Sequence, residues 1–191
     1  MTGQTQTESL AGKFLIAMPA MGDPRFAHSL IMMCAHSAEG AMGLIVNRRV
    51  PKLALDDLLE QLDIPKGPGS GGVPVHFGGP VEGGRGFVLH STDYPGHEGT
   101  IRINADFAMT ATRDVLVDIA AGRGPRRVIA ALGYSGWGPG QLESELRQNA
   151  WLTADADPDI VFDSDDLAKW ERALRALGID PLMLSGEGGR A

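Results

Sequence analysis

Short apolar runs separated by glycine- and proline-rich breaks predict several β-strands, most of them in the first half of the chain. Six segments share this pattern: Lys13–Met18, Ser29–His36, Ala41–Asn47, Val73–Phe77, Gly86–His90 and Thr100–Ile103. The four residues Ser37–Gly40 separate two of these runs and predict a β-hairpin. Trp151–Ala156 is a further candidate, at an edge of the sheet. Strands joined by hairpin-like turns favour a largely antiparallel sheet.

Apolar residues at helical spacing occur in only a few dispersed segments. Leu55–Leu62 and Arg113–Ala121 predict two helices. Asp165–Leu177 predicts the last helix, whose expected buried face carries Leu167, Trp170, Leu174 and Leu177. A few helices dispersed among many strands indicate an α+β fold with a mainly antiparallel sheet, rather than a doubly wound parallel sheet.

The segment Arg126–Leu152 is the part of the pattern that most resembles a site. Val128–Leu132 predicts a buried strand, and four glycines follow within Gly133–Gly140. Because glycine tolerates positive φ and close backbone approach, we expect this segment to be a tight turn. A helical pattern starts at Gln141, with Gly138 as the expected N-cap.

This predicted turn allows three interpretations. Ser135 lies on the predicted strand-to-helix turn, as the serine of a nucleophile elbow does. In that motif the catalytic histidine follows the serine, but all five histidines of this chain precede Ser135. The helix N-terminus could bind phosphate, but Glu143 and Glu145 would repel an anion. The third interpretation is structural, with glycines for close packing and Tyr134 and Trp137 as core or rim aromatics.

Charge and cysteine content narrow the functional classes. The 191 residues carry a net charge of −7, which disfavours sequence-independent nucleic-acid binding. The single Cys34 permits no disulfide within the chain and favours a reducing cytoplasm. No apolar run approaches the length of a membrane span. We expect residues 10–184 to form one domain between disordered tails at 1–9 and 185–191.

Metal sites are not predicted. Apart from Cys34-Ala35-His36, the five histidines lack the spacing of metal ligands. Asp155, Asp157 and Asp159 alternate like the start of a calcium-binding loop, but Ile160 stands where that loop needs glycine. We therefore expect neither a metal nor a cofactor.

Three separated motifs carry a family resemblance: Gly12–Asn47, Gly78–Val81 with Gly86–His90, and Gly133–Leu152. Together they resemble the bacterial YqgE/AlgH family, also called UPF0301, over nearly the whole chain apart from the tails and Pro65–Gly72. The resemblance implies an α+β fold with a branched β-sheet surrounded by a few helices, and no established biochemical activity. Some members carry the label of transcriptional regulator, from a role in alginate production.

The preferred hypothesis is a cytoplasmic, non-enzymatic module that binds a protein or small-molecule partner, through which any regulation would act. The candidate binding residues are polar and aromatic side chains near the predicted turn and two histidines: Tyr134, Ser135, Trp137, Gln141, Glu145, His36 and His90. If Trp137 contacts a partner, Trp137→Ala should leave the melting temperature nearly unchanged, whereas a loss of about 3–5 kcal/mol would mark a core residue.

Two alternatives stay open. The first is a hydrolase that uses Ser135 with His36 or His90 brought close by the fold. The second, least favoured, is a regulator that contacts DNA directly, which the acidic charge and the lack of a helix-turn-helix pattern disfavour. The sequence leaves the ligand, the partner and the oligomeric state open.

Overall fold

The computed structural model describes residues 8–19 and 23–184, so most of both predicted tails lies outside the described residues. Its sheet contains ten strands: β1 (Lys13–Ala17), β2 (Leu30–Ser37), β3 (Gly40–Ile45), β4 (Arg49–Ala54), β5 (Pro74–Phe77), β6 (Val81–His90), β7 (Thr100–Arg102), β8 (Ala108–Thr110), β9 (Val128–Trp137) and β10 (Trp151–Asp155). The helices of the described ranges are α1 (Leu55–Gln61), α2 (Arg113–Ala120), α3 (Gln141–Arg147), α4 (Pro158–Val161) and α5 (Lys169–Ala176). Two short 3-10 helices, η1 (Asp166–Ala168) and η2 (Pro181–Leu184), flank α5.

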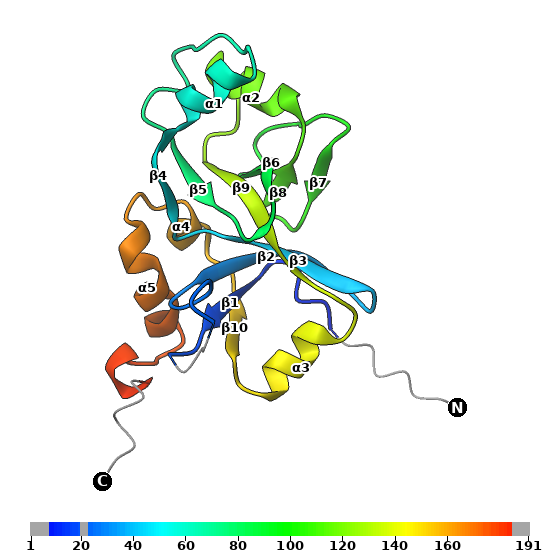
Figure 1. Ribbon diagram of the computed structural model, residues 1–191, viewed down its shortest axis with the longest axis vertical. Coiled ribbons are helices and arrows are strands. Elements are labelled where there is room, and N and C mark those ends of the chain that lie inside the picture. The colour runs from blue at the N-terminus through cyan, green and yellow to red at the C-terminus, as the bar shows by residue number, and fades with distance from the viewer. Residues whose placement is uncertain (1–7, 20–22, 185–191) are drawn as a thin grey trace.

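The strands follow the order β10-β1-β2-β3-β9-β6-β8-β7, and β5 joins this path as a side branch that also carries β4 (Figure 1). The pairing of β5 with β9 is parallel. The other pairings among the described strands are antiparallel. The predicted α+β fold with a mainly antiparallel, branched sheet is therefore confirmed.

Strand β9 is the branch point of the sheet. Its first half, Val128–Leu132, pairs with β6 on one side and β5 on the other. Its second half pairs with β3, where Ser135 lies opposite Gly43. Gly133, between the halves, has a φ of +73°, and a Cβ there would lie 2.4 Å from the carbonyl oxygen of Gly79. Glycine at this position therefore permits the left-handed conformation and the close crossing of two chain segments.

The predicted turn over Gly133–Gly140 is wrong for most of its length, because β9 continues to Trp137 and only the last three residues turn into α3. The N-cap of α3 is Gly140, not Gly138. Glycines in a strand mark a close approach of backbones as readily as a turn, and the sequence pattern does not separate the two.

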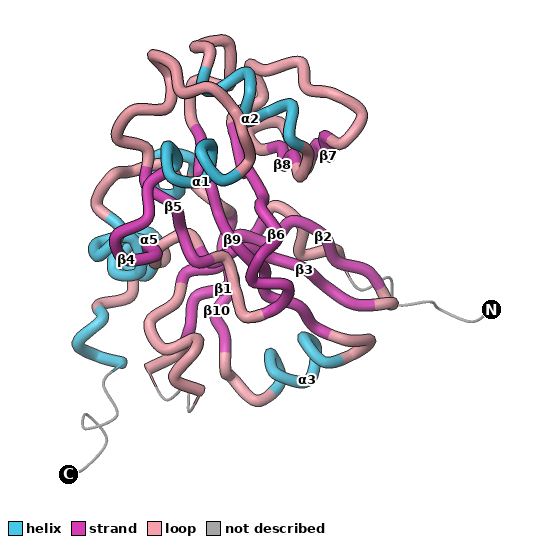
Figure 2. The backbone as a smooth tube through the Cα atoms, turned by 45° about the horizontal axis from the view of Figure 1, so that its top comes forward, coloured by secondary structure: helices cyan, strands magenta, loops and turns pink. Residues whose placement is uncertain are grey.

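The helices cover separate parts of the sheet (Figure 2). α1 and α2 lie at one end, where Leu59 and Ile119 join a core that includes the first half of β9. α3 lies at the opposite end and packs Leu142 among β1, β2 and β3. α5 packs Trp170 and Leu174 into the largest core.

The predicted last helix begins later than expected. Asp166–Ala168 is the 3-10 helix η1, and α5 starts at Lys169. Leu167 is 92% exposed and Leu177 is 41% exposed, so both predictions of burial are wrong. The tighter 3-10 turn, with three residues per turn, rotates Leu167 away from the buried face. Four short elements, β4, β8, α4 and η2, were not predicted.

Candidate functional site

A groove of about 900 Å³ lies between the β2–β3 hairpin and strands β6, β7 and β8. We call it the hairpin groove. Its lining includes one cation, Arg85, and one acid, Glu39, but is mostly apolar or aromatic, with Met42, Phe87, Ile101, Met109 and Tyr134 among its members. Sites for small molecules typically combine such a lining with a few polar groups.

Alternation along β9 decides which predicted residues reach this groove. Tyr134 is half-buried and lines it, and its ring packs edge-on against Phe87 with centroids 5.7 Å apart. Gly136, two residues on, is exposed in the groove. Ser135 lies between them and is fully buried, as expected on the other face of a strand.

The environment of Ser135 argues against a catalytic role. Its hydroxyl donates a hydrogen bond to the carbonyl oxygen of Gly78 at 3.2 Å, and the side chain is 0% exposed. Within the described residues, no histidine or carboxylate is a hydrogen-bond partner of Ser135. A serine nucleophile needs both an adjacent base and access to substrate, and Ser135 has neither here.

Trp137 borders the hairpin groove, but its side chain belongs to the core. It is 6% exposed, its ring centroid lies 6.1 Å from that of Trp151, and it shares a cluster with Leu142 of α3. This burial fits the structural interpretation of Trp137 and counts against a role as an exposed contact residue.

His36 is a link between β2, the start of the described chain and α3. Its Nδ1 accepts a hydrogen bond from the backbone N–H of Leu10 at 3.0 Å, so Nε2 carries the proton and donates to Glu143 at 2.6 Å. The hydrogen bond from His36 lowers the pKa of the Glu143 carboxyl. A bulge between Met33 and Ala35 changes the register of β2 before His36. His36 therefore borders the groove with both ring nitrogens already engaged.

His90 is buried in a separate network on β6 and is not brought close to Ser135. Its Nδ1–H donates to the carbonyl of Ser91, and its Nε2 accepts from the hydroxyl of Thr110, both at 2.8 Å. Thr110 is in turn hydrogen-bonded to Thr100 at 2.7 Å. Burial lowers the pKa of His90, which favours the neutral ring that this network requires.

Gln141 and Glu145 of α3 serve the local structure. The side-chain oxygen of Gln141 accepts a hydrogen bond from the backbone N–H of Gly138 at 3.0 Å. Oε1 of Glu145 accepts a long hydrogen bond from Nε1 of Trp151 at 3.5 Å. Neither residue lines the hairpin groove. Of the seven predicted residues, the groove therefore brings together Tyr134, Trp137 and His36.

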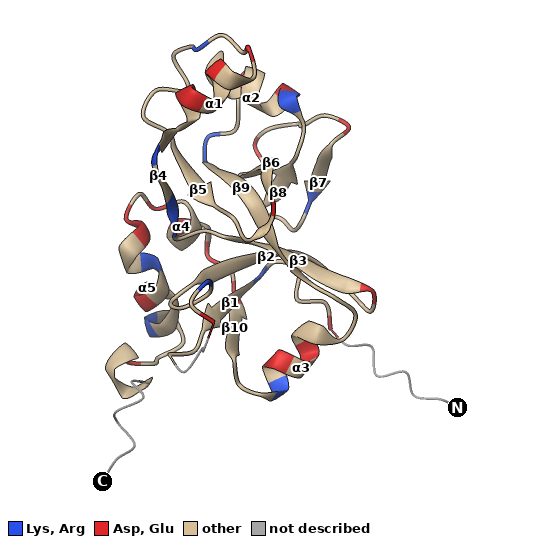
Figure 3. Ribbon diagram, in the orientation of Figure 1, with Lys and Arg blue, Asp and Glu red and all other residues tan. Residues whose placement is uncertain are grey.

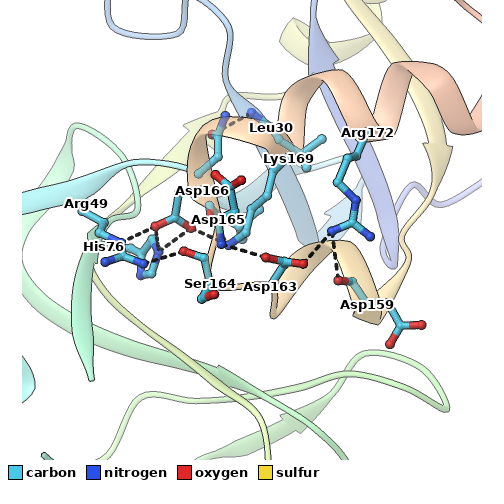
Figure 4. Close-up of polar contacts among 12 residues, drawn as sticks. Leu30, Arg49, His76, Asp159, Asp163, Ser164, Asp165, Asp166, Lys169 and Arg172 are labelled. Atoms are coloured by element: carbon cyan, nitrogen blue, oxygen red, sulfur yellow. Dashed lines mark hydrogen bonds and ion pairs between the residues drawn. The ribbon is translucent and has the colours of Figure 1, made fainter. Parts of the chain in front are cut away.

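The sequence did not predict the most densely charged cluster, which is centred on the buried Asp166. Figure 4 shows Arg49 of β4, His76 of β5 and Lys169 of α5 converging on this carboxylate. Lys169 Nζ lies 2.6 Å from Asp166 and also donates to the carbonyl of Val46 at 2.9 Å. We call these four side chains the Asp166 cluster.

The protonation states of the Asp166 cluster follow from this geometry. Burial opposes ionisation of Asp166, but hydrogen bonds from its three donors outweigh it and hold the pKa of the carboxyl well below its usual range. Burial lowers the pKa of Lys169, and the contact with Asp166 opposes that shift. A hollow of about 750 Å³ opens beside the cluster, lined by Arg49, Phe77 and Leu167 among others.

The sequence offered few signals for this cluster. Asp166 and Lys169 are three apart in a helical segment, but Arg49 is 117 positions and His76 is 90 positions from Asp166. Only the fold brings these residues together.

Comparison with known proteins places the chain in a family. The family model described as AlgH-like matches residues 14–182. The chain belongs to the AlgH-like family. It is 55% identical over 188 residues to a UPF0301 protein of Paracoccus denitrificans, covering 97% of this chain and 99% of the relative. A UPF0301 protein of Jannaschia sp. is 58% identical over 186 residues, with 97% of each chain covered.

Solved structures agree with this placement. The solution structure of the AlgH protein from Pseudomonas aeruginosa is 41% identical and matches with a TM-score of 0.79, covering 98% of this chain and 99% of that one. A crystal structure of a Corynebacterium diphtheriae protein, 20% identical, matches with a TM-score of 0.75 over 94% and 93% of the two chains. The second likeness concerns the fold alone.

The charged surface of this AlgH-like protein is mixed. Acidic and basic residues are interspersed along the ribbon in Figure 3. Near the start of β9, Arg127 lies 2.9 Å from Asp159, and Arg123 lies 3.7 Å from Asp118. Two of the three arginines before β9, Arg123 and Arg127, are thus paired with carboxylates, which disfavours phosphate binding there.

Two further features of the AlgH-like chain bear on its chemistry. Cys34 is buried and its pKa is raised to about 12 by desolvation, so it lacks the thiolate character of a reactive cysteine. Across residues 8–19 and 23–184, no group of three potential ligands could hold a metal ion. In the same ranges, no helix has the length and apolar character needed to cross a membrane.

Proposed function

We propose that this AlgH-like protein is a non-enzymatic module that binds a protein or small-molecule partner in the hairpin groove. The observation that carries the proposal is Tyr134, whose half-buried ring lines the groove while its hydroxyl has no hydrogen-bond partner among the described residues. The hydroxyl is not among the buried unpaired polar atoms of the described residues, so it reaches solvent in the groove, where a ligand can replace water as its hydrogen-bond partner.

The rival activities have weaker support. A hydrolase would need Ser135 exposed and paired, whereas Gly78 and the sheet enclose it. Direct DNA contact would need a contiguous basic face, whereas Arg123 and Arg127 are paired with acids. Any role in regulation would therefore act through the partner in the groove. The cytoplasm is the expected compartment, because the buried Cys34 fits reducing conditions.

Native mass spectrometry of protein purified gently from its own cells tests this proposal. We expect an adduct mass on the wild-type chain that Tyr134→Ala removes. Leu167→Ala is the matched control, because Leu167 is 92% exposed beside the other hollow and its loss should not affect folding. An adduct that survives Tyr134→Ala and disappears with Leu167→Ala would contradict the proposal. A clean subunit mass in the wild type would argue against any tightly bound small molecule.

A further inference from the structure

A second, smaller pocket of about 190 Å³ lies beside the hairpin groove, between the sheet and helices α1 and α2. Phe87, Ala111 and Thr112 line both spaces and lie just beyond Val88 and Thr110, where the pairing of β6 with β8 ends, so the two spaces adjoin at these residues. We call the smaller space the helix pocket. Thr110 and Arg113 also line it, but most of its walls are apolar side chains from the sheet and from α1 and α2 or the residue after α1: Leu58, Leu62, Val88, Leu116 and Ala130.

Gly86 keeps the helix pocket open. It lies in β6 opposite Leu132 and lines the pocket, and a Cβ built on it would meet nothing within 4 Å. Its φ is outside the left-handed region, so the backbone itself does not require glycine. A glycine inside a strand weakens the strand and often marks the close approach of a ligand or another chain.

Polar groups are placed where the two spaces meet. The Thr112 hydroxyl is buried without a hydrogen-bond partner among the described residues, although Thr112 occupies the N-cap position of α2, where such a hydroxyl usually caps the helix. Arg85, next to Gly86, lines the groove with its guanidinium 5.1 Å from the centroid of the Phe87 ring. Its ion pair with Glu82 is long, at 3.6 Å, and the side chain is 56% exposed.

We infer that the occupant is an amphiphile with one short apolar chain and an anionic head, such as a medium-chain carboxylate. This inference rests on the proposed function and names the class of ligand. The apolar chain enters the helix pocket past Gly86, where burial of its methylenes drives binding. The head stays in the groove, where Arg85 can pair with a carboxylate and the Thr112 hydroxyl can donate a hydrogen bond.

Isothermal titration calorimetry with octanoate tests the inference. We expect wild-type protein to bind octanoate, and Gly86→Val to weaken binding about tenfold or more, because the new side chain fills the pocket. Gly84→Val is the matched control, since Gly84 is also exposed in β6, lies clear of other atoms and lines neither space. Octanoate affinity should be unchanged in this control.

Arg85→Gln tests the head of the ligand. This substitution should lower the affinity for octanoate about two- to fivefold, as expected for a partly exposed ion pair, and should leave the affinity for octanol unchanged. Equal octanoate affinity in wild type and Gly86→Val would overturn the assignment of the helix pocket. Loss of octanol and octanoate binding to the same extent in Arg85→Gln would overturn the assignment of an anionic head.

The failure of this inference can be distinguished from failure of the proposed function. Wild-type protein that does not bind octanoate overturns the inference alone, because the adduct test with Tyr134→Ala does not depend on the ligand class. An adduct that persists in Tyr134→Ala, in a protein that does bind octanoate, places the natural partner outside the groove and overturns the proposed function.

Discussion

The Asp166 cluster and the junction of the hairpin groove with the helix pocket are both polar, but they differ in how their polar groups are partnered. In the cluster, three donors from β4, β5 and α5 surround one carboxylate. Nδ1 of His76 in this cluster is nevertheless buried without a partner among the described residues. At the junction, the Thr112 hydroxyl is buried without a partner, and the Tyr134 hydroxyl in the adjoining groove has none among the described residues. Paired opposite charges hold elements of the fold together, whereas Thr112 and Tyr134 lie beside open space that a ligand can enter.

The largest effect on stability should come from breaking the Asp166 cluster. Asp166→Ala leaves the fully buried Lys169 without its counter-charge and should cost about 3–5 kcal/mol of unfolding free energy. Urea denaturation measures it. The double variant Asp166→Leu with Lys169→Met removes both charges and should recover much of the loss. A loss below about 1 kcal/mol in Asp166→Ala would show that the cluster does not hold α5 to the sheet.

Trp137→Ala should have the next largest effect and lower the free energy of unfolding by about 3 kcal/mol. This loss is at the low end for a buried tryptophan, because Trp137 borders the groove. Thermal unfolding followed by circular dichroism measures it. An almost unchanged melting temperature would support the hypothesis from the sequence that Trp137 contacts a partner. A large loss would leave Tyr134 as the aromatic residue of β9 that serves the groove.

The sequence predicted the framework better than the site. The strands β1, β2 and β3 and the hairpin between β2 and β3 could be predicted, because apolar runs and turn-forming residues are signals that lie within a few positions of one another. The length of β9 could not be predicted from the sequence. Gly133 is needed because the backbone of Gly79, far away in the sequence, passes too close for a Cβ, and not because the chain turns there. Tyr134 could be named from its neighbours in the sequence, but its ring contact with Phe87 depends on the pairing of β6 with β9.

Acid should weaken the fold through His90, because both of its ring nitrogens are hydrogen-bonded inside the protein in a way that requires the neutral ring. Because burial lowers its pKa from the usual 6.5, the unfolded chain takes up the proton first. The contribution of His90 is complete above about pH 6.5 and is lost as the pH falls toward its folded pKa, at no more than about 1.4 kcal/mol per pH unit. Urea denaturation across this range, with NMR titration of the His90 ring, measures it. A His90 ring that titrates at or above 6.5 would contradict the account.

The smallest expected effects on stability are those of substitutions at Ser135 and Tyr134, two neighbouring residues of β9, and they should differ in size. Ser135→Ala removes a buried hydrogen bond to the carbonyl of Gly78, which keeps the backbone N–H of Ile45 as a donor, and should cost about 1 kcal/mol. Tyr134→Phe removes a hydroxyl that has no protein partner and should cost less than about 0.5 kcal/mol. Urea denaturation of both variants side by side measures the difference. Equal losses would show that Tyr134 is tied into the fold and is not free for a ligand.

The most direct test of the central claim, that the open junction and not the closed cluster is the binding site, is NMR mapping of backbone amides during titration with octanoate. The account predicts shifts concentrated at Gly86, Phe87, Thr112 and Tyr134. Shifts concentrated at Arg49, Phe77 and Leu167, which line the hollow beside the Asp166 cluster, would contradict it.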